Sequence, residues 1–111
     1  MIRGDLVTIA VTGDYGKPRP ALVVQANAFA ALPSVTVLRL TSMLCGEDLI
    51  RITVQPSSGN GLRVASQVMI DKAVTLPRER VGTVFGRLEH EAMVAVSRAL
   101  AAFLGLDGLA V

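Results

Sequence analysis

The hydrophobic pattern of this 111-residue chain changes period once, and that change limits the folds open to it. Segment 49–55, LIRITVQ, alternates apolar and polar residues, which is typical of a half-exposed β-strand. After residue 88, apolar residues recur instead at helical spacing, as a stripe that comprises Ala92, Met93, Val96, Ala99, Leu100 and Phe103. The pattern predicts a mainly β (α+β) fold with one helix over 89–104, ended by Gly105.

Other strand-like segments precede the helix, at 5–11, 18–25, 34–40, 62–71 and 81–88. The loop between the first two is too short for a crossover, so these two strands should form an antiparallel hairpin. Residues 56–61, PSSGNG, have the composition of a turn. We expect a curled antiparallel sheet of about five to seven strands closed by the helix, in a single domain over residues 1–111.

Composition places the chain among intracellular proteins that assemble with a second chain. Hydrophobic residues make up 51% and charged residues 18%, a balance that favours a homodimer with covered apolar surface. The net charge of +2 is compatible with nucleic-acid binding. Cys45 is the single cysteine, and the N-terminus lacks the pattern of a signal peptide. We expect a cytoplasmic protein with no membrane span.

One cation is held in an unusual setting, between two prolines in KPRP. Pro18 and Pro20 restrict the backbone of Arg19 to extended conformations at the start of an apolar strand. Its guanidinium can serve an anionic ligand or pair with a nearby carboxylate. With Tyr15, Lys17, the Thr41–Ser42 pair and Asp71, it provides the material for a phosphodiester pocket. Metal-ligand clusters, a P-loop and a dinucleotide fingerprint are missing from the sequence, so we expect neither metal nor cofactor.

Several segments in this order resemble the PemK/MazF family of toxin–antitoxin ribonucleases. They are RGDLVTIAV at the start, KPRPALVVQ, LRLTS at the end of the third strand, GLRVASQVMIDKAVTLPRERVG, and the terminal LEHEAMVAVSRALAAFLGL. The step RP after a glycine-containing loop and the TS pair are the most specific. The resemblance covers nearly the whole chain.

The resemblance implies an SH3-like antiparallel barrel with a C-terminal helix that dimerises and cleaves single-stranded RNA, often mRNA, at short sequences. Cleavage without metal would leave a 2′,3′-cyclic phosphate and a 5′-OH. A co-expressed antitoxin with a flexible acidic tail would cover the RNA groove. The family pattern places catalysis on Arg19 and Thr41, with Asp71 as the base. We expect RNA contacts from Tyr15, Lys17, Ser42 and Gln67.

One position departs from the family pattern and keeps alternatives open. Some members carry an arginine two residues before the acid, where this chain has Met69. Arg19 would then stabilise charge while water protonates the leaving group, or the protein is slow or not a ribonuclease. Asp71 is either a base or substrate contact, or a residue that bonds backbone amides where a strand turns a corner. The alternative functions are a CcdB-like toxin that binds gyrase without ribonuclease activity, and a non-toxic RNA-binding barrel.

Overall fold

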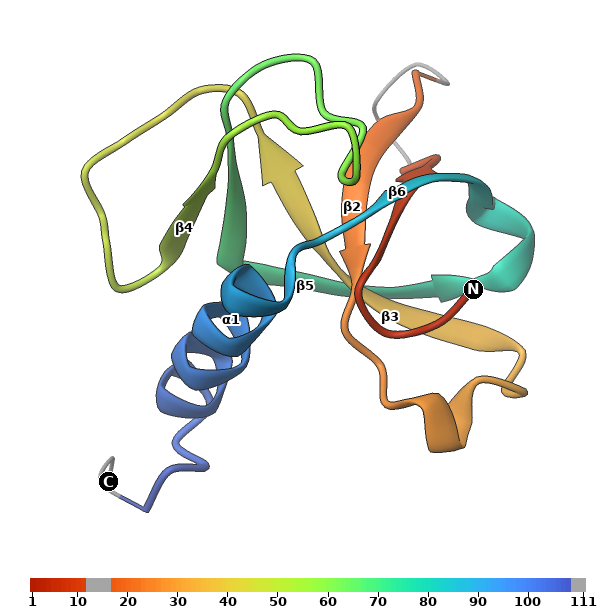
Figure 1. Ribbon diagram of the computed structural model, residues 1–111. Helices are drawn as coiled ribbons and strands as arrows, with labels where there is room; N and C mark the ends of the chain where they lie inside the picture. The colour runs from red at the N-terminus through yellow and green to blue at the C-terminus, as the bar shows by residue number, and fades with distance from the viewer. Residues whose placement is uncertain (12–16, 109–111) are drawn as a thin grey trace.

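A computed structural model describes residues 1–11 and 17–108 and contains one six-stranded antiparallel sheet (Figure 1). Its strand order is β4-β5-β3-β2-β1-β6. The strands are β1 (Asp5–Ile9), β2 (Arg19–Val23), β3 (Ser34–Thr41), β4 (Arg51–Val54), β5 (Ser66–Pro77) and β6 (Val81–Arg87). Two 3-10 turns, η1 (Asn27–Phe29) and η2 (Arg78–Arg80), precede β3 and β6, and helix α1 (His90–Phe103) follows. The predicted hairpin is confirmed, with Val7 opposite Ala21.

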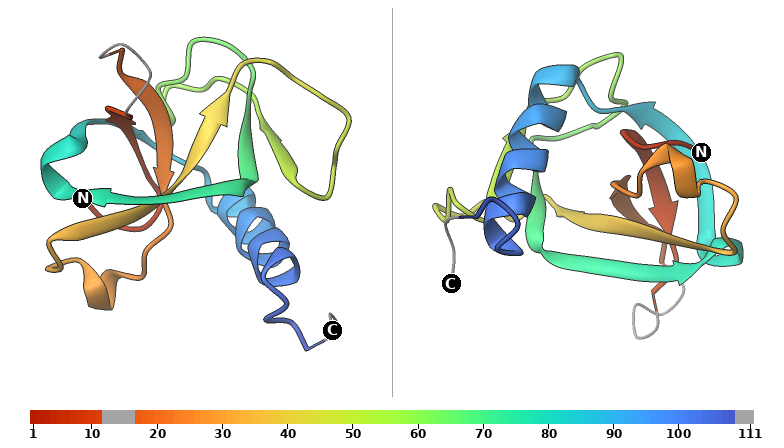
Figure 2. Two further views of the ribbon diagram at one scale, coloured as in Figure 1. Left: turned by 180° about the vertical axis from the view of Figure 1, so that it is seen from behind. Right: turned by 90° about the horizontal axis from the view of Figure 1, so that it is seen from below.

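The sheet bends sharply in the middle of β5. Opposite β3, β5 loses its regular register between Leu38 and Leu40, so residues 69–72 form a corner between two straight halves. Figures 1 and 2 show the two halves running in different directions and the sheet curling around them. β4 and β6 are the outer strands of this sheet, which is not closed into a complete ring. The expected SH3-like fold with a C-terminal helix is confirmed, as an open barrel.

Two apolar clusters occupy opposite faces of the sheet. The first, which α1 covers, includes Leu22, Leu38 and Leu40 among its buried residues. The second includes Val35 and Val37. Successive side chains in a strand alternate between faces, so β3 changes its buried face halfway along. The face that is apolar at Val35 and Val37 continues with the polar residues Arg39 and Thr41.

Helix α1 packs on the first cluster, as its apolar stripe predicts. Val96 is fully buried, and four neighbours are partly buried against the same cluster: Ala92, Met93, Ala99 and Leu100. Phe103 differs from the prediction, because the helix end extends past the sheet and leaves this side chain 50% exposed. Gly105, at φ +71°, ends the helix as predicted. No helix of the described residues is long and apolar enough to span a membrane.

Candidate functional site

Four polar residues form a row across neighbouring strands at one edge of the sheet. Thr41 lies opposite Gln67, and Gln67 lies opposite Thr53 on its other side. Ala21 lies opposite Arg39, and the same register continued by two residues brings Arg19 level with Thr41. Paired residues project from the same face of a sheet. The predicted pair Arg19 and Thr41 therefore lies on neighbouring strands with side chains on one face.

The Thr41 hydroxyl is fixed by the turn that follows it. Its Oγ1 accepts a hydrogen bond from the backbone N–H of Met43 at 3.0 Å. A hydroxyl that accepts one bond keeps its own proton for donation, so Thr41 can still bond a phosphate oxygen. Ser42 is exposed directly beyond the strand end. The Thr41–Ser42 pair thus presents two hydroxyls at this edge.

The predicted cations lie at the start of β2, the strand that neighbours β3. Lys17 and Arg19 are exposed at the entry to β2, where Pro18 and Pro20 hold the backbone extended. Tyr15, the remaining predicted contact in this loop, lies outside the described residues. The edge that carries Thr41 and Ser42 therefore also carries two positive charges suited to a phosphodiester.

Gln67 holds the loop after β3. Its Oε1 accepts the Cys45 N–H at 3.1 Å, while its Nε2 donates to the Cys45 carbonyl at 2.9 Å and to Thr53 Oγ1 at 3.1 Å. The residue is only 4% exposed. The Gln67 amide is therefore occupied by hydrogen bonds within the protein. Gln67 would affect RNA binding indirectly, by fixing the loop that begins at Ser42.

Asp71 lies in the corner of β5 and forms an ion pair. Arg51 Nη1 donates a hydrogen bond to Asp71 Oδ1, and Lys72 Nζ is 3.9 Å from Oδ2. Partial burial raises the pKa of Asp71, but the bond from Arg51, the backbone amide of Asp71 and both positive charges together hold the pKa below its ordinary value. A carboxylate with a lowered pKa is a weaker base.

The predicted site omitted two arginines of the same face. Arg51 lies opposite Met69, so a guanidinium from the adjacent strand occupies the neighbourhood of the position where the family pattern has its own arginine. Arg39 lies two residues before Thr41 on the same face of β3. The alternation of 49–55 places Arg51 on the polar side of its strand, whereas Arg39 shares its face with the buried Val35 and Val37 and is not marked by a local pattern. The alternating pattern identifies the face of the strand on which Arg51 lies. The strand order is needed to place that arginine on the same face of the sheet as Arg19.

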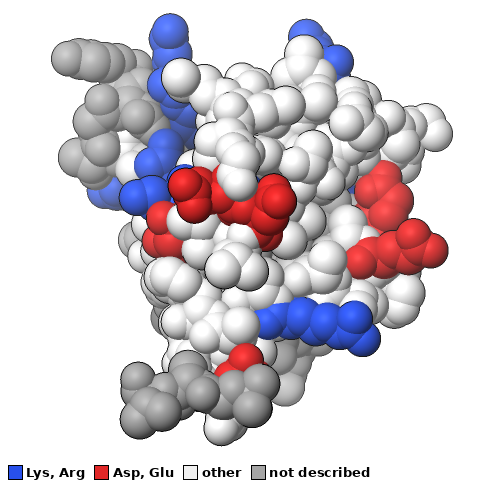
Figure 3. All heavy atoms as spheres, turned by 90° about the vertical axis from the view of Figure 1, so that its left-hand side faces the viewer, with Lys and Arg blue, Asp and Glu red and all other residues white. Residues whose placement is uncertain are grey.

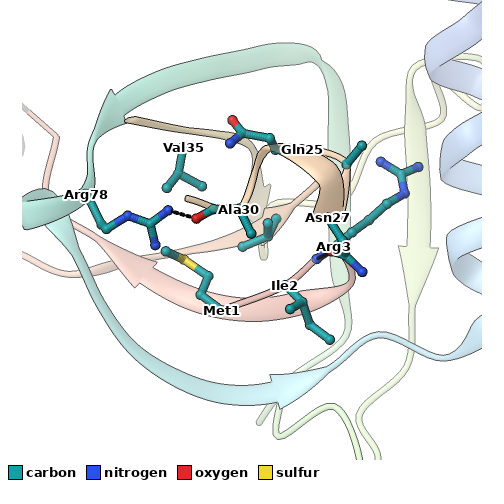
Figure 4. A pocket seen from close by; sticks show the side chains of 10 residues that line it. Met1, Ile2, Arg3, Gln25, Asn27, Ala30, Val35 and Arg78 are labelled. Carbon is teal, nitrogen blue, oxygen red and sulfur yellow. Dashed lines mark hydrogen bonds between the residues drawn. The ribbon is translucent and has the colours of Figure 1, made fainter. Parts of the chain in front are cut away.

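Two surface features bear on where an anionic ligand could bind. The small cavity in Figure 4, where Arg78 reaches across to the Ala30 carbonyl, has about 10 Å³ of space, which is enough for about one water. Figure 3 shows small groups of basic and acidic side chains on the side of the molecule that carries β4, with one basic group directly against an acidic one. Recognition of an anion on that side would therefore depend on individual arginines and not on one continuous basic surface.

Comparison with known proteins relates the whole chain to one family. Residues 2–104 match the family model of the PemK-like, MazF-like toxins of type II toxin–antitoxin systems. A protein of Mycolicibacterium smegmatis (strain ATCC 700084 / mc(2)155), named probable endoribonuclease MazF, is 44% identical over 109 residues. The alignment covers 97% of this chain and 100% of that protein.

Solved structures with the same fold include toxins and toxin–antitoxin complexes. An endoribonuclease in complex with its cognate antitoxin, from a mycobacterial species, has a TM-score of 0.80 and 26% identity, with 96% of each chain covered. Mycobacterium tuberculosis toxin MazF-mt6 has a TM-score of 0.79 and 25% identity, over 93% of this chain and 98% of that one. A MazE–MazF structure from Deinococcus radiodurans has a TM-score of 0.77 and 25% identity, with 96% of each chain covered.

Proposed function

Because the chain belongs to the family of PemK-like, MazF-like toxins of type II toxin–antitoxin systems, we propose that it cleaves single-stranded RNA, including mRNA, at short sequences. The observation that carries this proposal is the pairing of Ala21 with Arg39 and of Thr41 with Gln67, because the first pairing continued by two residues would bring Arg19 level with Thr41. A guanidinium and a hydroxyl on one face are two donors for a single phosphate. The 44% identical endoribonuclease supports the same reaction class.

The proposed chemistry uses no metal and proceeds through the ribose. The 2′-oxygen attacks the adjacent phosphorus, and the bond from phosphorus to the 5′-oxygen breaks. Water takes the proton of the 2′-OH and supplies one to the leaving oxygen, so no co-reactant is consumed. The products are a 2′,3′-cyclic phosphate and a 5′-OH. Arg19 stabilises the additional negative charge on the phosphate, and Thr41 donates to one of its oxygens.

Asp71 has a supporting role in this proposal. Its bond to Arg51 fixes a guanidinium on the same polar face, and its lowered pKa suits a permanent negative charge better than proton removal. We therefore assign Asp71 the role of holding Arg51 in place, and not that of a base at the reacting ribose.

The proposed partners are a second copy of the chain and an antitoxin. Large apolar side chains are exposed around the C-terminal end of α1 and the loop before β4: Leu49 at 87%, Phe103 at 50%, Leu104 at 56% and Leu106 at 74%. An apolar patch of this kind favours a homodimer. A flexible acidic antitoxin tail would fold on binding along the sheet edge that carries Lys17 and Arg19. Neighbours solved with antitoxin are in keeping with this partner.

Purified protein incubated with a long RNA in EDTA tests the proposal. Discrete fragments at recurring short sequences are the expected result. Intact RNA together with inhibition of gyrase supercoiling would instead identify the gyrase-binding alternative, which the comparisons do not favour. RNA binding without cleavage would identify a non-catalytic RNA-binding barrel.

A further inference from the structure

A groove of about 390 Å³ opens at the sheet edge that carries the site, on the opposite face. Two of its lining residues directly follow the site residues in sequence: Pro20 comes after Arg19, and Ser42 comes after Thr41. Neighbouring residues of a strand are about 3.3 Å apart along it, with side chains on opposite faces. The groove and the pair Arg19 and Thr41 therefore lie on opposite faces of the sheet, at the same ends of β2 and β3.

The lining of the groove combines three kinds of chemistry. Thr8 and Ser42 provide hydroxyls, Leu62 and Phe85 provide apolar surface, and Arg63 provides a positive charge. Arg63 is exposed. A nucleotide needs this combination, because its base prefers an apolar or aromatic wall, its hydroxyls need polar partners, and its phosphate needs a cation.

The loop that carries Arg63 is fixed to the body of the protein by Asn60, which is fully buried. Asn60 Oδ1 accepts the N–H groups of Ser57 and Leu62, each at 3.0 Å. Asn60 Nδ2 donates to the Gln55 carbonyl at 2.9 Å and to Glu89 Oε1 at 2.8 Å. These bonds join both ends of the loop to the residue before α1. The backbone that carries the Arg63 side chain is therefore held in a defined position.

Two glycines allow the same loop to lie against β6. At Gly86 a Cβ would come within 2.0 Å of the Asn60 carbonyl oxygen, and at Gly61 within 2.5 Å of the Phe85 carbonyl oxygen. Gly61 also has φ +67°, a conformation that favours glycine. The Arg87 N–H donates to the Gly59 carbonyl at 2.9 Å. The Phe85 wall and the Arg63 loop are thus packed as one unit.

We propose that this groove binds the RNA nucleotide next to the one cleaved, and that Arg63 pairs with its phosphate. The inference rests on the proposed ribonuclease function and adds a substrate contact to it. Arg63 acts on binding and not on the reacting phosphate, so its loss raises KM and leaves kcat nearly unchanged.

The test compares Arg63→Ala with Arg63→Lys and with Arg98→Ala, which removes an exposed charge from α1. The probe is an oligonucleotide with the cleavage site mapped in the long RNA and a 2′-deoxyribose at that site to prevent cleavage. Arg63→Ala should weaken binding about ten- to a hundredfold, as expected for a charged hydrogen bond. It should also reduce the slope of log K against log salt by about 0.7, the value for one phosphate contact to a single strand.

Arg63→Lys should keep the slope of the wild type, and Arg98→Ala should keep both slope and affinity. Cleavage of the all-ribose oligonucleotide by Arg63→Ala should show the raised KM. If the wild type cleaves RNA while Arg63→Ala binds with unchanged affinity and slope, the groove assignment is wrong and the ribonuclease assignment stands. A wild type that neither binds nor cleaves RNA would overturn both.

Discussion

At the scale of single residues, Arg19 carries most of the proposed chemistry. Arg19→Ala should lower kcat for RNA cleavage about a hundredfold or more, the usual cost of one donor to a developing oxyanion. Its side chain is exposed, so the thermal midpoint should change little. Thr41→Val should lower the rate by a smaller factor, because Arg19 remains. Single-turnover cleavage and thermal unfolding of both variants check this, and a fully active Arg19→Ala would show that the site has been misplaced.

A substitution at Asp71 distinguishes a supporting role of this residue from a catalytic one. Asp71→Asn keeps an acceptor oxygen and removes the charge that pairs with Arg51. We expect less than a tenfold change in single-turnover rate and a stability loss of about 1 kcal/mol, in the range of one hydrogen bond. Asp71→Asn cleaving a hundredfold more slowly at unchanged stability would make Asp71 the base instead.

At the scale of elements, Glu89 joins the loop after β4 to the start of α1. Its Oε1 accepts bonds from Ser57 Oγ at 2.6 Å and from Asn60 Nδ2 at 2.8 Å. Glu89→Ala leaves a buried donor of Asn60 without this acceptor and should cost about 1 to 3 kcal/mol in the free energy of unfolding. Glu89→Gln retains an acceptor oxygen and should cost less. Urea unfolding of the two variants measures the difference, and equal losses would contradict this role.

The same contacts set a pH dependence. The bond from Ser57 lowers the pKa of Glu89, partial burial opposes it, and the backbone amide and Asn60 lower it further, so the pKa of Glu89 lies below its ordinary value. A carboxyl with a lowered pKa in the folded state stabilises the protein above its unfolded pKa, and that contribution is lost as pH falls through the folded value. Thermal midpoints should therefore decline below about pH 4.5, and less steeply in Glu89→Gln.

The elements were largely predictable from sequence, whereas their side-chain contacts were not. Alternation and helical spacing located the strands and α1, because both patterns are local. The segment 62–65 was expected to be strand and is loop, since Asn60 holds it by bonds outside any ladder. The bonds from Arg51 to Asp71 and from Asn60 to Glu89 join residues 20 and 29 positions apart. Such contacts depend on strand order and register, which local patterns do not contain.

At the scale of the whole molecule, the exposed apolar patch predicts a homodimer. Leu49→Glu puts a charge on the most exposed leucine of that patch and should shift sedimentation toward the monomer at micromolar concentration. Leu32→Glu is the matched control, because Leu32 is 48% exposed and lies outside the patch, before β3. A wild type that sediments as a monomer would contradict the proposed dimer.

The central claim is that this molecule cleaves RNA through attack by the ribose 2′-OH, with Arg19 stabilising the phosphate. A pair of oligonucleotides identical except for ribose or 2′-deoxyribose at the cleavage site tests it most directly. In EDTA, the wild type should cut only the ribose form, into fragments that end in a 2′,3′-cyclic phosphate and a 5′-OH, and Arg19→Ala should cut neither at a comparable rate. Cleavage of the 2′-deoxy form, or 5′-phosphate ends on the fragments, would contradict the claim.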